Sequence, residues 1–187
     1  MDKKQVISNV AIELFVELGF HGTATSKIAK NAGVANGTLF NYFKTKDELI
    51  LTLYHNILEQ MDSYLVERMT SYSISKESFQ SLFFASLFWS LDNRTQYQYL
   101  LQFNHSPYFK EVAPSILNQV DHPHVILIQN AIDVVLLKPM SALFIYALFT
   151  AQINALYTYL LANQFSQKEE LELMHDAFEM LWKMIED

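Results

Sequence analysis

Residues 19–49 read GFHGTATSKIAKNAGVANGTLFNYFKTKDEL, and this stretch decides the fold of the N-terminal part of the chain. Its apolar residues fall at helical spacing and predict two short helices, at about residues 26–32 and 36–43. The run Gly33-Val34-Ala35 separates them as a tight turn, in which Gly33 supplies the positive φ that such a turn needs. The stretch therefore predicts a helix-turn-helix.

A further helix precedes this pair. Residues 6–18 form an amphipathic pattern that Gly19 can terminate. Thr23 or Thr25 is expected to be the N-cap of the next helix, because a threonine hydroxyl can accept a backbone N–H bond there.

The rest of the chain also has helical periodicity. Thr45 with Glu48 predicts a capping box at the start of a long helix that ends near residue 69. Further helices are expected at residues 77–91, 97–103, 107–120, 125–137, 139–162 and 168–186. The chain is thus predicted to be all-α. A three-helix helix-turn-helix domain at residues 1–48 precedes a larger helical domain at residues 49–187.

Charge is unevenly distributed along the chain. The net charge of −7 argues against a nucleic-acid partner, since phosphate contacts require Lys and Arg. However, residues 1–48 carry six lysines and five acidic side chains, whereas residues 49–187 carry seven basic and fifteen acidic ones. The predicted helix 36–43 has no carboxylate, and Lys44 and Lys46 follow it. Such a surface suits contact with DNA phosphates.

One run of residues resembles the DNA-binding signature of the tetracycline-repressor (TetR) family. The matching positions are Ile28-Ala29, Ala32-Gly33-Val34, Gly37-Thr38-Leu39-Phe40, Tyr42-Phe43, Lys46 and Leu49. They span about a quarter of the chain, and the remainder is similar in layout only. The resemblance implies that residues 49–187 are a helical ligand-binding and dimerisation domain. It implies a cytoplasmic, homodimeric transcriptional repressor, which a small-molecule effector releases from a roughly palindromic operator of double-stranded DNA.

By this resemblance, helix 36–43 enters the major groove of DNA. Asn36 and Thr38 are expected at base edges, and Gly37 lets the backbone approach the DNA closely. Asn41 is expected at bases or at phosphate. The full set of expected DNA-binding residues is Thr25, Ser26, Asn36, Gly37, Thr38, Phe40, Asn41, Tyr42 and Lys46.

The segment also departs from the family pattern. Ala24 and Ala35 stand where the family often has Ser or Thr, and Phe40 stands where it often has Tyr. These changes remove hydroxyl groups that would bond phosphate or cap a helix. A helical small-molecule-binding protein with a degenerate DNA reader is therefore the alternative interpretation.

The last predicted helix carries a narrow apolar seam. Its apolar residues step by three and four, which is typical of a helix that packs on one partner helix. By the family layout, helices 139–162 and 168–186 form a four-helix bundle with those of a second subunit. The expected dimer-interface residues are Phe149, Ile153, Leu156, Met174, Phe178, Leu181 and Ile185.

Aromatic side chains are dense between residues 79 and 157, with a few amides and a histidine among them. A mostly apolar pocket with a few polar groups suits a lipophilic or aromatic small molecule. The expected ligand-binding residues are Phe84, Phe88, Tyr97, Phe103, His105, Asn130, Phe149, Asn154 and Tyr157.

Other chemistries are disfavoured. His122-Pro123-His124 and Glu172-x-x-His175 lack the partners that a metal site needs, and no nucleophile triad, P-loop or dinucleotide glycine motif occurs. No metal, cofactor or enzymatic activity is expected.

Residues 139–167 carry no charge, but polar side chains interrupt them, which favours a buried or dimerising helix over a membrane span. The absence of cysteine suits a reducing compartment.

Overall fold

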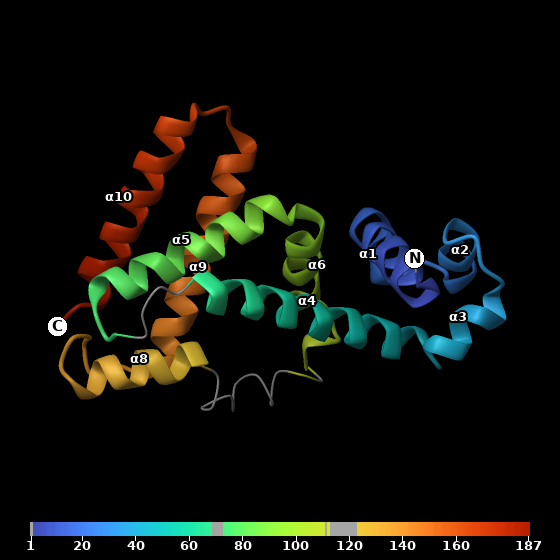
Figure 1. Ribbon diagram of the computed structural model, residues 1–187, viewed down its shortest axis with the longest axis horizontal. Helices are drawn as coiled ribbons and strands as arrows, with labels where there is room; N and C mark the ends of the chain where they lie inside the picture. Colours follow the sequence, from blue (N-terminus) through green and yellow to red (C-terminus); the bar gives the residue numbers. More distant parts are fainter. Residues whose placement is uncertain (1, 69–72, 111, 113–122) are drawn as a thin grey trace. The chain divides into compact units, whose positions relative to one another are not determined.

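The computed structural model describes residues 2–68, 73–110, 112 and 123–187 (Figure 1). The described residues are helical apart from turns and one isolated bridge between Leu137 and Glu186, which confirms the predicted all-α class. The chain divides into two compact units, one made of residues 1–62 and 93–112, the other of residues 63–92 and 113–187. The boundary between a helix-turn-helix domain at residues 1–48 and a second domain at residues 49–187 stays a prediction.

The helices follow the sequence-based expectations within a few residues. The first unit contains α1 (Lys3–Gly22), α2 (Thr25–Asn31), α3 (Asn36–Tyr42), the first part of α4 (Lys46–Arg68) and α6 (Arg94–Asn104). The second contains the end of α4, then α5 (Lys76–Asp92), α8 (Pro123–Asp133), α9 (Ala142–Ala162) and α10 (Gln167–Ile185). Most of the helix expected at residues 107–120 lies outside the described residues.

The end of α1 differs from expectation in one respect. Gly19 has φ 77° and ψ 161°, so it interrupts the regular helix as predicted. Thr23 is buried, and its hydroxyl donates back to the carbonyl oxygens of Leu14 at 3.0 Å and Gly19 at 2.8 Å. The prediction of a threonine N-cap for α2 is wrong, because the N-cap is Ala24, which has no side-chain bond. The Thr23 hydroxyl stabilises the break in α1 instead.

An aromatic cluster forms much of the core of the first unit. The Phe20 ring, just after the break, meets those of Tyr99, Phe103 and Tyr108 with centroid distances of 5.3, 6.3 and 5.7 Å. Phe103 also stacks on Tyr54 of α4 at 3.9 Å with an interplanar angle of 14°. This cluster, defined by these five residues, joins α1, α4 and α6, and edge-to-face ring pairs add to the stabilisation that burial gives.

A single hydroxyl reinforces the cluster. Tyr99 is fully buried, and its hydroxyl donates to the carbonyl oxygen of Ile50 on α4 at 2.8 Å. Burial raises the pKa of Tyr99 far above its ordinary value, and the nearby Tyr108 raises it further. The hydroxyl therefore stays protonated and remains a donor to α4.

The apolar seam of α10 lies in the core of the second unit. Phe178 is 0% exposed within the single chain, and its ring lies 5.7 Å from that of Phe83 on α5. Phe83 in turn meets Phe149 of α9 at 5.5 Å. All of the residues expected at the dimer interface are buried in the same way, namely Phe149, Ile153, Leu156, Met174, Phe178, Leu181 and Ile185. A side chain buried inside one subunit has no surface left for a partner, so this set belongs to the protomer core.

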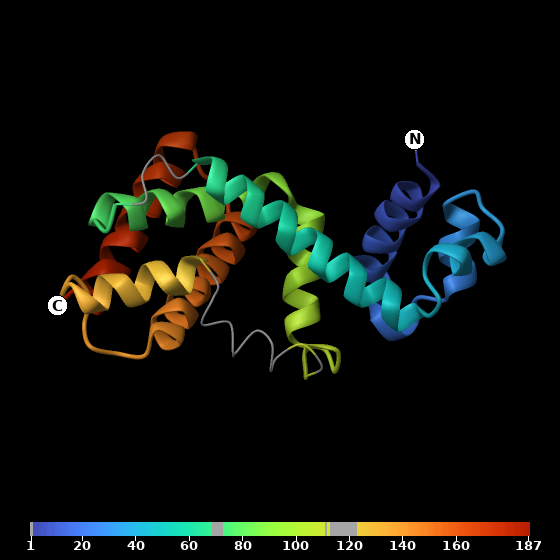
Figure 2. The same ribbon diagram turned by 60° about the horizontal axis from the view of Figure 1, so that its bottom comes forward.

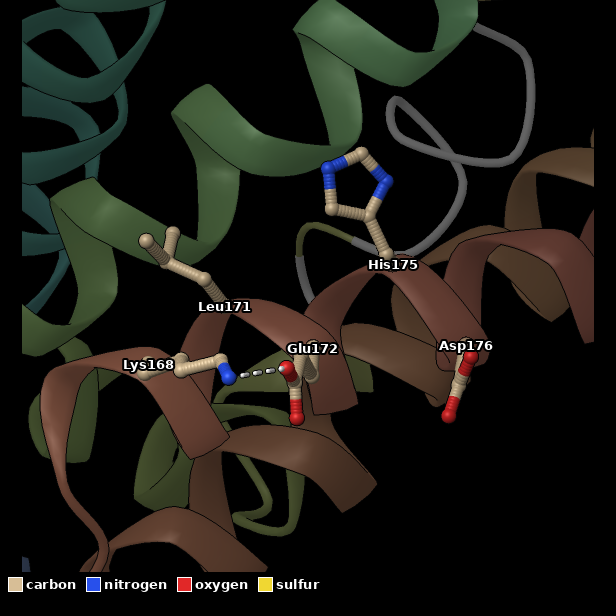
Figure 3. A pocket seen from close by; sticks show the side chains of 5 residues that line it. All are labelled: Lys168, Leu171, Glu172, His175 and Asp176. Atoms are coloured by element: carbon tan, nitrogen blue, oxygen red, sulfur yellow. Dashed lines mark ion pairs between the residues drawn. The ribbon is translucent and has the colours of Figure 1, made fainter.

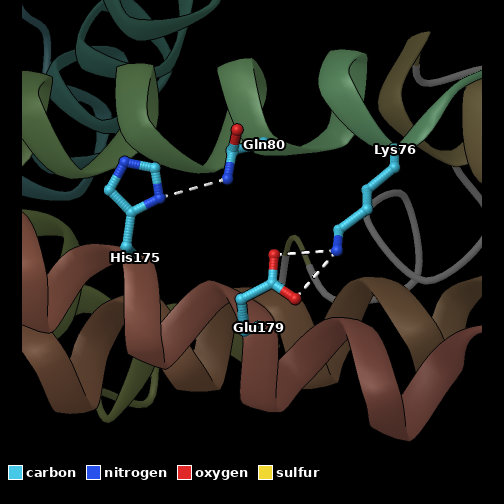
Figure 4. A network of polar contacts seen from close by, with 4 residues as sticks. All are labelled: Lys76, Gln80, His175 and Glu179. Carbon is cyan, nitrogen blue, oxygen red and sulfur yellow. Dashed lines mark hydrogen bonds and ion pairs between the residues drawn. The ribbon is translucent and has the colours of Figure 1, made fainter.

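Polar contacts also join α5 to α10 (Figure 4). The Lys76 ammonium lies 2.8 Å from each carboxylate oxygen of Glu179 and 5.9 Å from the centre of the Trp182 ring. Gln80 and His175 are joined by a 3.4 Å hydrogen bond. Because both partners of the ion pair are partly exposed, its contribution to stability is below about 1 kcal/mol. Burial of the aromatic residues therefore dominates this packing.

Helix α9 is, within the described ranges, the one helix long and apolar enough to cross a membrane by length and composition. One third of its most apolar window is buried in the chain, where α9 packs on α5, α8 and α10. Its other face exposes Phe144 and Tyr159. These properties also fit a helix of a soluble core with an unpartnered face.

The end of α8 supplies a stability prediction. Val135 adopts φ 61° at the position where a helix usually ends in glycine, and the N–H of Leu136 bonds the carbonyl of Ala131 at 2.9 Å. Val135 is 67% exposed, so its side chain contributes little burial. Val135→Gly should therefore raise the free energy of unfolding by about 1 kcal/mol, since the left-handed conformation penalises a Cβ. Val134→Gly is the control and should give no gain. Equal effects of both changes in urea unfolding would contradict the assignment of strain to Val135.

Candidate nucleic-acid interface

Helices α1, α2 and α3 pack against one another and lie side by side in both views (Figures 1 and 2). Ile28 of α2 and Leu39 of α3 are fully buried, as is Phe43 directly after α3. Ala29 is buried too. Ala32, which follows α2, and Val34, in the turn, are half-buried.

The turn between α2 and α3 depends on one glycine. Gly33 has φ 65°, as predicted, and its N–H bonds the carbonyl of Lys30 at 3.1 Å. The next N–H, of Val34, bonds the carbonyl of Ala29 at 3.0 Å. A Cβ at Gly33 would meet nothing within 4 Å, so the backbone conformation and not the available space requires glycine here.

The predicted DNA-binding residues lie on α2, on α3 and at the start of α4. Within this set, Thr25, Thr38, Phe40 and Lys46 are half-buried, and Ser26, Asn36, Gly37, Asn41 and Tyr42 are exposed. Gly37 has room around it, because a Cβ there would meet nothing within 4 Å. None of the nine is buried, so each has surface available for a ligand. Their contacts with DNA stay a prediction.

The N-terminal ends of α2 and α3 have no side-chain caps. Ala24 and Ala35 are the N-cap residues, as the departures from the family pattern indicate, and neither makes a side-chain bond to the helix. The first backbone N–H groups of both helices are thus not bonded by the residue that usually caps them.

The two carboxylates nearest to the end of α3 make hydrogen bonds within the protein. Glu48 accepts the Lys44 N–H at 2.7 Å, and its own N–H bonds the Thr45 hydroxyl oxygen at 3.0 Å. Asp47 accepts the hydroxyl of Tyr108 at 2.8 Å. One half of the predicted Thr45–Glu48 capping box is therefore present, while the Glu48 carboxylate bonds the N–H of Lys44 in place of that of Thr45. One oxygen of each acid bonds a neighbouring donor of the same unit.

The residues predicted to bind an effector fall into both units. Tyr97, Phe103 and His105 belong to the first, where Phe103 is part of the aromatic cluster and His105 is exposed. The second unit contains the other six, which are Phe84, Phe88, Asn130, Phe149, Asn154 and Tyr157. Phe149 and Tyr157 are buried, Phe84 and Asn154 are half-buried, and Phe88 and Asn130 are exposed. Their role in binding an effector stays a prediction.

A groove of about 500 Å³ runs along α10 (Figure 3). It is lined by Lys168, Leu171, Glu172, His175 and Asp176, with the Lys168 ammonium 3.6 Å from a Glu172 oxygen. It includes none of the predicted ligand residues, and one leucine is its only apolar lining side chain. Across the described part of the chain, no group of three or more His, Cys, Asp or Glu could hold a metal ion; His122 lies outside that part.

Comparison with known proteins agrees with the arrangement of α1 to α4. Residues 7–53 match the family model described as bacterial regulatory proteins, tetR family. The fatty acid metabolism regulator protein of Bacillus subtilis (strain 168) is 37% identical over 73 residues, which are 37% of this chain. That alignment spans 38% of the length of the curated relative.

Solved structures extend the likeness to the whole chain. The crystal structure of a putative tetR family transcription regulator from Shewanella sp. PV-4 is 26% identical, covers 100% of both chains and has a TM-score of 0.88. AibR in complex with isovaleryl coenzyme A and operator DNA has a TM-score of 0.72 at 12% identity, with 98% of this chain and 97% of that chain covered, which shows a shared fold. The helix-turn-helix thus matches the family model of the bacterial regulatory proteins of the tetR family, and the full length of the chain is similar to a solved tetR family transcription regulator.

Proposed function

We propose that the protein is a cytoplasmic, homodimeric transcriptional repressor that binds a roughly palindromic DNA operator through α3. The observation that carries this proposal is the surface of α3. Its exposed residues include Asn36, Asn41 and Tyr42, it has no carboxylate, and Lys44 follows it. Asp47 and Glu48, which follow α3, accept hydrogen bonds from Tyr108 and from the backbone of Lys44 within the same unit.

The effector proposed for this repressor is a small lipophilic molecule with an acyl chain or an aromatic group. The name of the Bacillus subtilis relative refers to fatty acid metabolism. AibR, with the same fold, binds isovaleryl coenzyme A and operator DNA. Residues 49–187 have an excess of acidic side chains, which favours an effector with few negative charges over a whole coenzyme A thioester.

Helix α4 is the proposed route of coupling between effector and operator. It is continuous from Lys46 to Arg68 and supplies residues to both units. In the first unit it bonds Tyr99 and stacks on Phe103 through Tyr54. An effector that displaces α4 thereby displaces α1 and α6 as well. Such coupling is reciprocal, so DNA must weaken effector binding by the same factor, on the order of 5–150-fold for a coupling of about 1–3 kcal/mol.

The test of DNA binding is selection of genomic fragments by the purified protein. The repressor should enrich a sequence with two related half-sites, and its affinity should fall steeply with salt because phosphate contacts release counterions. Recovery of no enriched sequence would favour the alternative of a degenerate DNA reader, for which the uncapped ends of α2 and α3 are the supporting observation.

Gly37→Ala separates a DNA role from a structural one. Gly37 lies inside α3 without a positive φ, and the space around it is open. Alanine should therefore raise the free energy of unfolding by about 0.5–1 kcal/mol, because glycine is the poorer helix former. The same change should weaken binding to the selected duplex, since the added methyl group prevents close approach of the backbone.

The matched control is Gly33→Ala. At φ 65° an alanine is strained, so this variant should lose about 1 kcal/mol of unfolding free energy. Denaturant unfolding gives the stability of both variants, and titration with the selected duplex gives their DNA affinity. A Gly37→Ala protein with unchanged DNA affinity would contradict the approach of α3 to the duplex.

The proposed dimer uses the exposed apolar side chains of α9 and α10 in place of the buried seam. These are Phe144 and Tyr159 on α9, and Met180 and Met184 on α10. Met180 is 68% exposed and Met184 is 46% exposed, and their spacing of four residues places both on one face of α10.

Met180→Lys with Met184→Lys should therefore give folded monomers in light scattering, because the charges would be buried against a second subunit. Phe178→Lys should instead lower the free energy of unfolding, since Phe178 belongs to the core of one subunit. If the double methionine variant stays dimeric, the interface lies elsewhere.

A further inference from the structure

The six lysines of residues 1–48 are all accessible. Lys3, Lys4, Lys27, Lys30 and Lys44 are exposed, and Lys46 is half-buried. Within the described residues, no ion pair joins any of them to a carboxylate. The acids nearby bond backbone or hydroxyl donors instead, so the positive charge of these lysines is not neutralised inside the protein.

Two of these lysines begin α1, close to the end of α3. The Lys4 ammonium lies 5.8 Å from the centre of the Phe43 ring, and Phe43 is the residue that ends α3. Lys3 is its neighbour in the chain. Lys44 follows Phe43 directly in the chain, so residues from two distant parts of the sequence bring lysines to the neighbourhood of Phe43.

The backbone fixes this position. The carboxylate of Asp2 caps α1 by accepting the N–H of Lys4 at 3.2 Å, and the Asp2 carbonyl accepts the N–H of Val6 at 3.1 Å. Ile7, one turn into α1, is fully buried in the core beneath. The backbone of the first turn of α1 is thus held in place. The cation–π contact between Lys4 and Phe43 is weak by comparison, because such a contact stabilises an exposed lysine by only about 0.5–1 kcal/mol. The Lys4 ammonium can therefore exchange this contact for a stronger anionic partner.

We propose that Lys3 and Lys4 form a second contact with the DNA backbone. Phe43 positions the Lys4 ammonium beside the end of α3, so that the two lysines bind phosphates that flank those bound by Lys44 and Lys46. The contact lengthens the DNA footprint without reading bases, because an ammonium group binds phosphate as a point charge. This inference rests on the proposed function and adds residues that the signature of the helix-turn-helix does not include.

The test compares the salt dependence of DNA binding in matched variants. Binding to the selected duplex is measured between 50 and 200 mM salt, roughly the range over which phosphate binding dominates the change in affinity. Lys3→Ala with Lys4→Ala should lower the slope of log affinity against log salt by about 0.9 for each phosphate that the variant no longer binds, hence by about 2. Lys4→Arg should keep the wild-type slope.

Lys168→Ala with Lys183→Ala is the matched control, because it also removes two positive charges, here from exposed side chains of the second unit. The Lys3 and Lys4 variant should also be insensitive to a duplex shortened at its flanks, whereas the wild type should bind that duplex more weakly. A slope change no larger than that of the Lys168 and Lys183 control would overturn the second contact and leave DNA binding intact. Failure of the wild-type protein to bind any duplex would instead overturn the proposed function, and this inference with it.

Discussion

The hydrogen bond from the buried Tyr99 hydroxyl to the carbonyl of Ile50 is the constraint around which the first unit is built. A buried phenol hydroxyl without a hydrogen-bond partner destabilises the fold by about 1–3 kcal/mol. This penalty favours the position of α6 along α4 in which the Tyr99 hydroxyl reaches the carbonyl of Ile50. The aromatic cluster then fixes the break in α1, because Phe20 lies against Tyr99 only when Gly19 takes its positive φ and Thr23 closes the turn. Helices α2 and α3 pack on the same α1, with Ile28, Leu39 and Phe43 buried among them.

This arrangement changes which segments belong with the helix-turn-helix. The local sequence signature stops near residue 49, but the compact unit continues to residue 62 and includes α6 from much later in the chain. Tyr108, just after α6, reaches Asp47 in the first turn of α4. This hydrogen bond connects the residues that follow α6 with the start of α4, next to Lys44 and Lys46.

Local signals could be predicted from the sequence, and long-range partners could not. Gly33 marks the turn because the requirement for positive φ depends only on neighbouring residues. Ser166 and Glu169 form a complete capping box at α10, and their Ser-x-x-Glu spacing is a local signal of the same kind. By contrast, the three-four spacing of Phe178 and its neighbours shows that one face of α10 is buried, but not by what. In the structure, α5 and α9 of the same chain cover that face, which a pattern within one helix cannot specify.

Native-state hydrogen exchange tests most directly whether α6 is part of the unit that carries the helix-turn-helix. If one core joins them, the slowest amides of α1 and α6 should open with the same free energy, and Tyr99→Phe should lower both by the same amount, about 0.5–1.5 kcal/mol for one hydrogen bond. Separate opening free energies, with α6 alone affected by the substitution, would contradict a single core and remove α6 from the route of coupling.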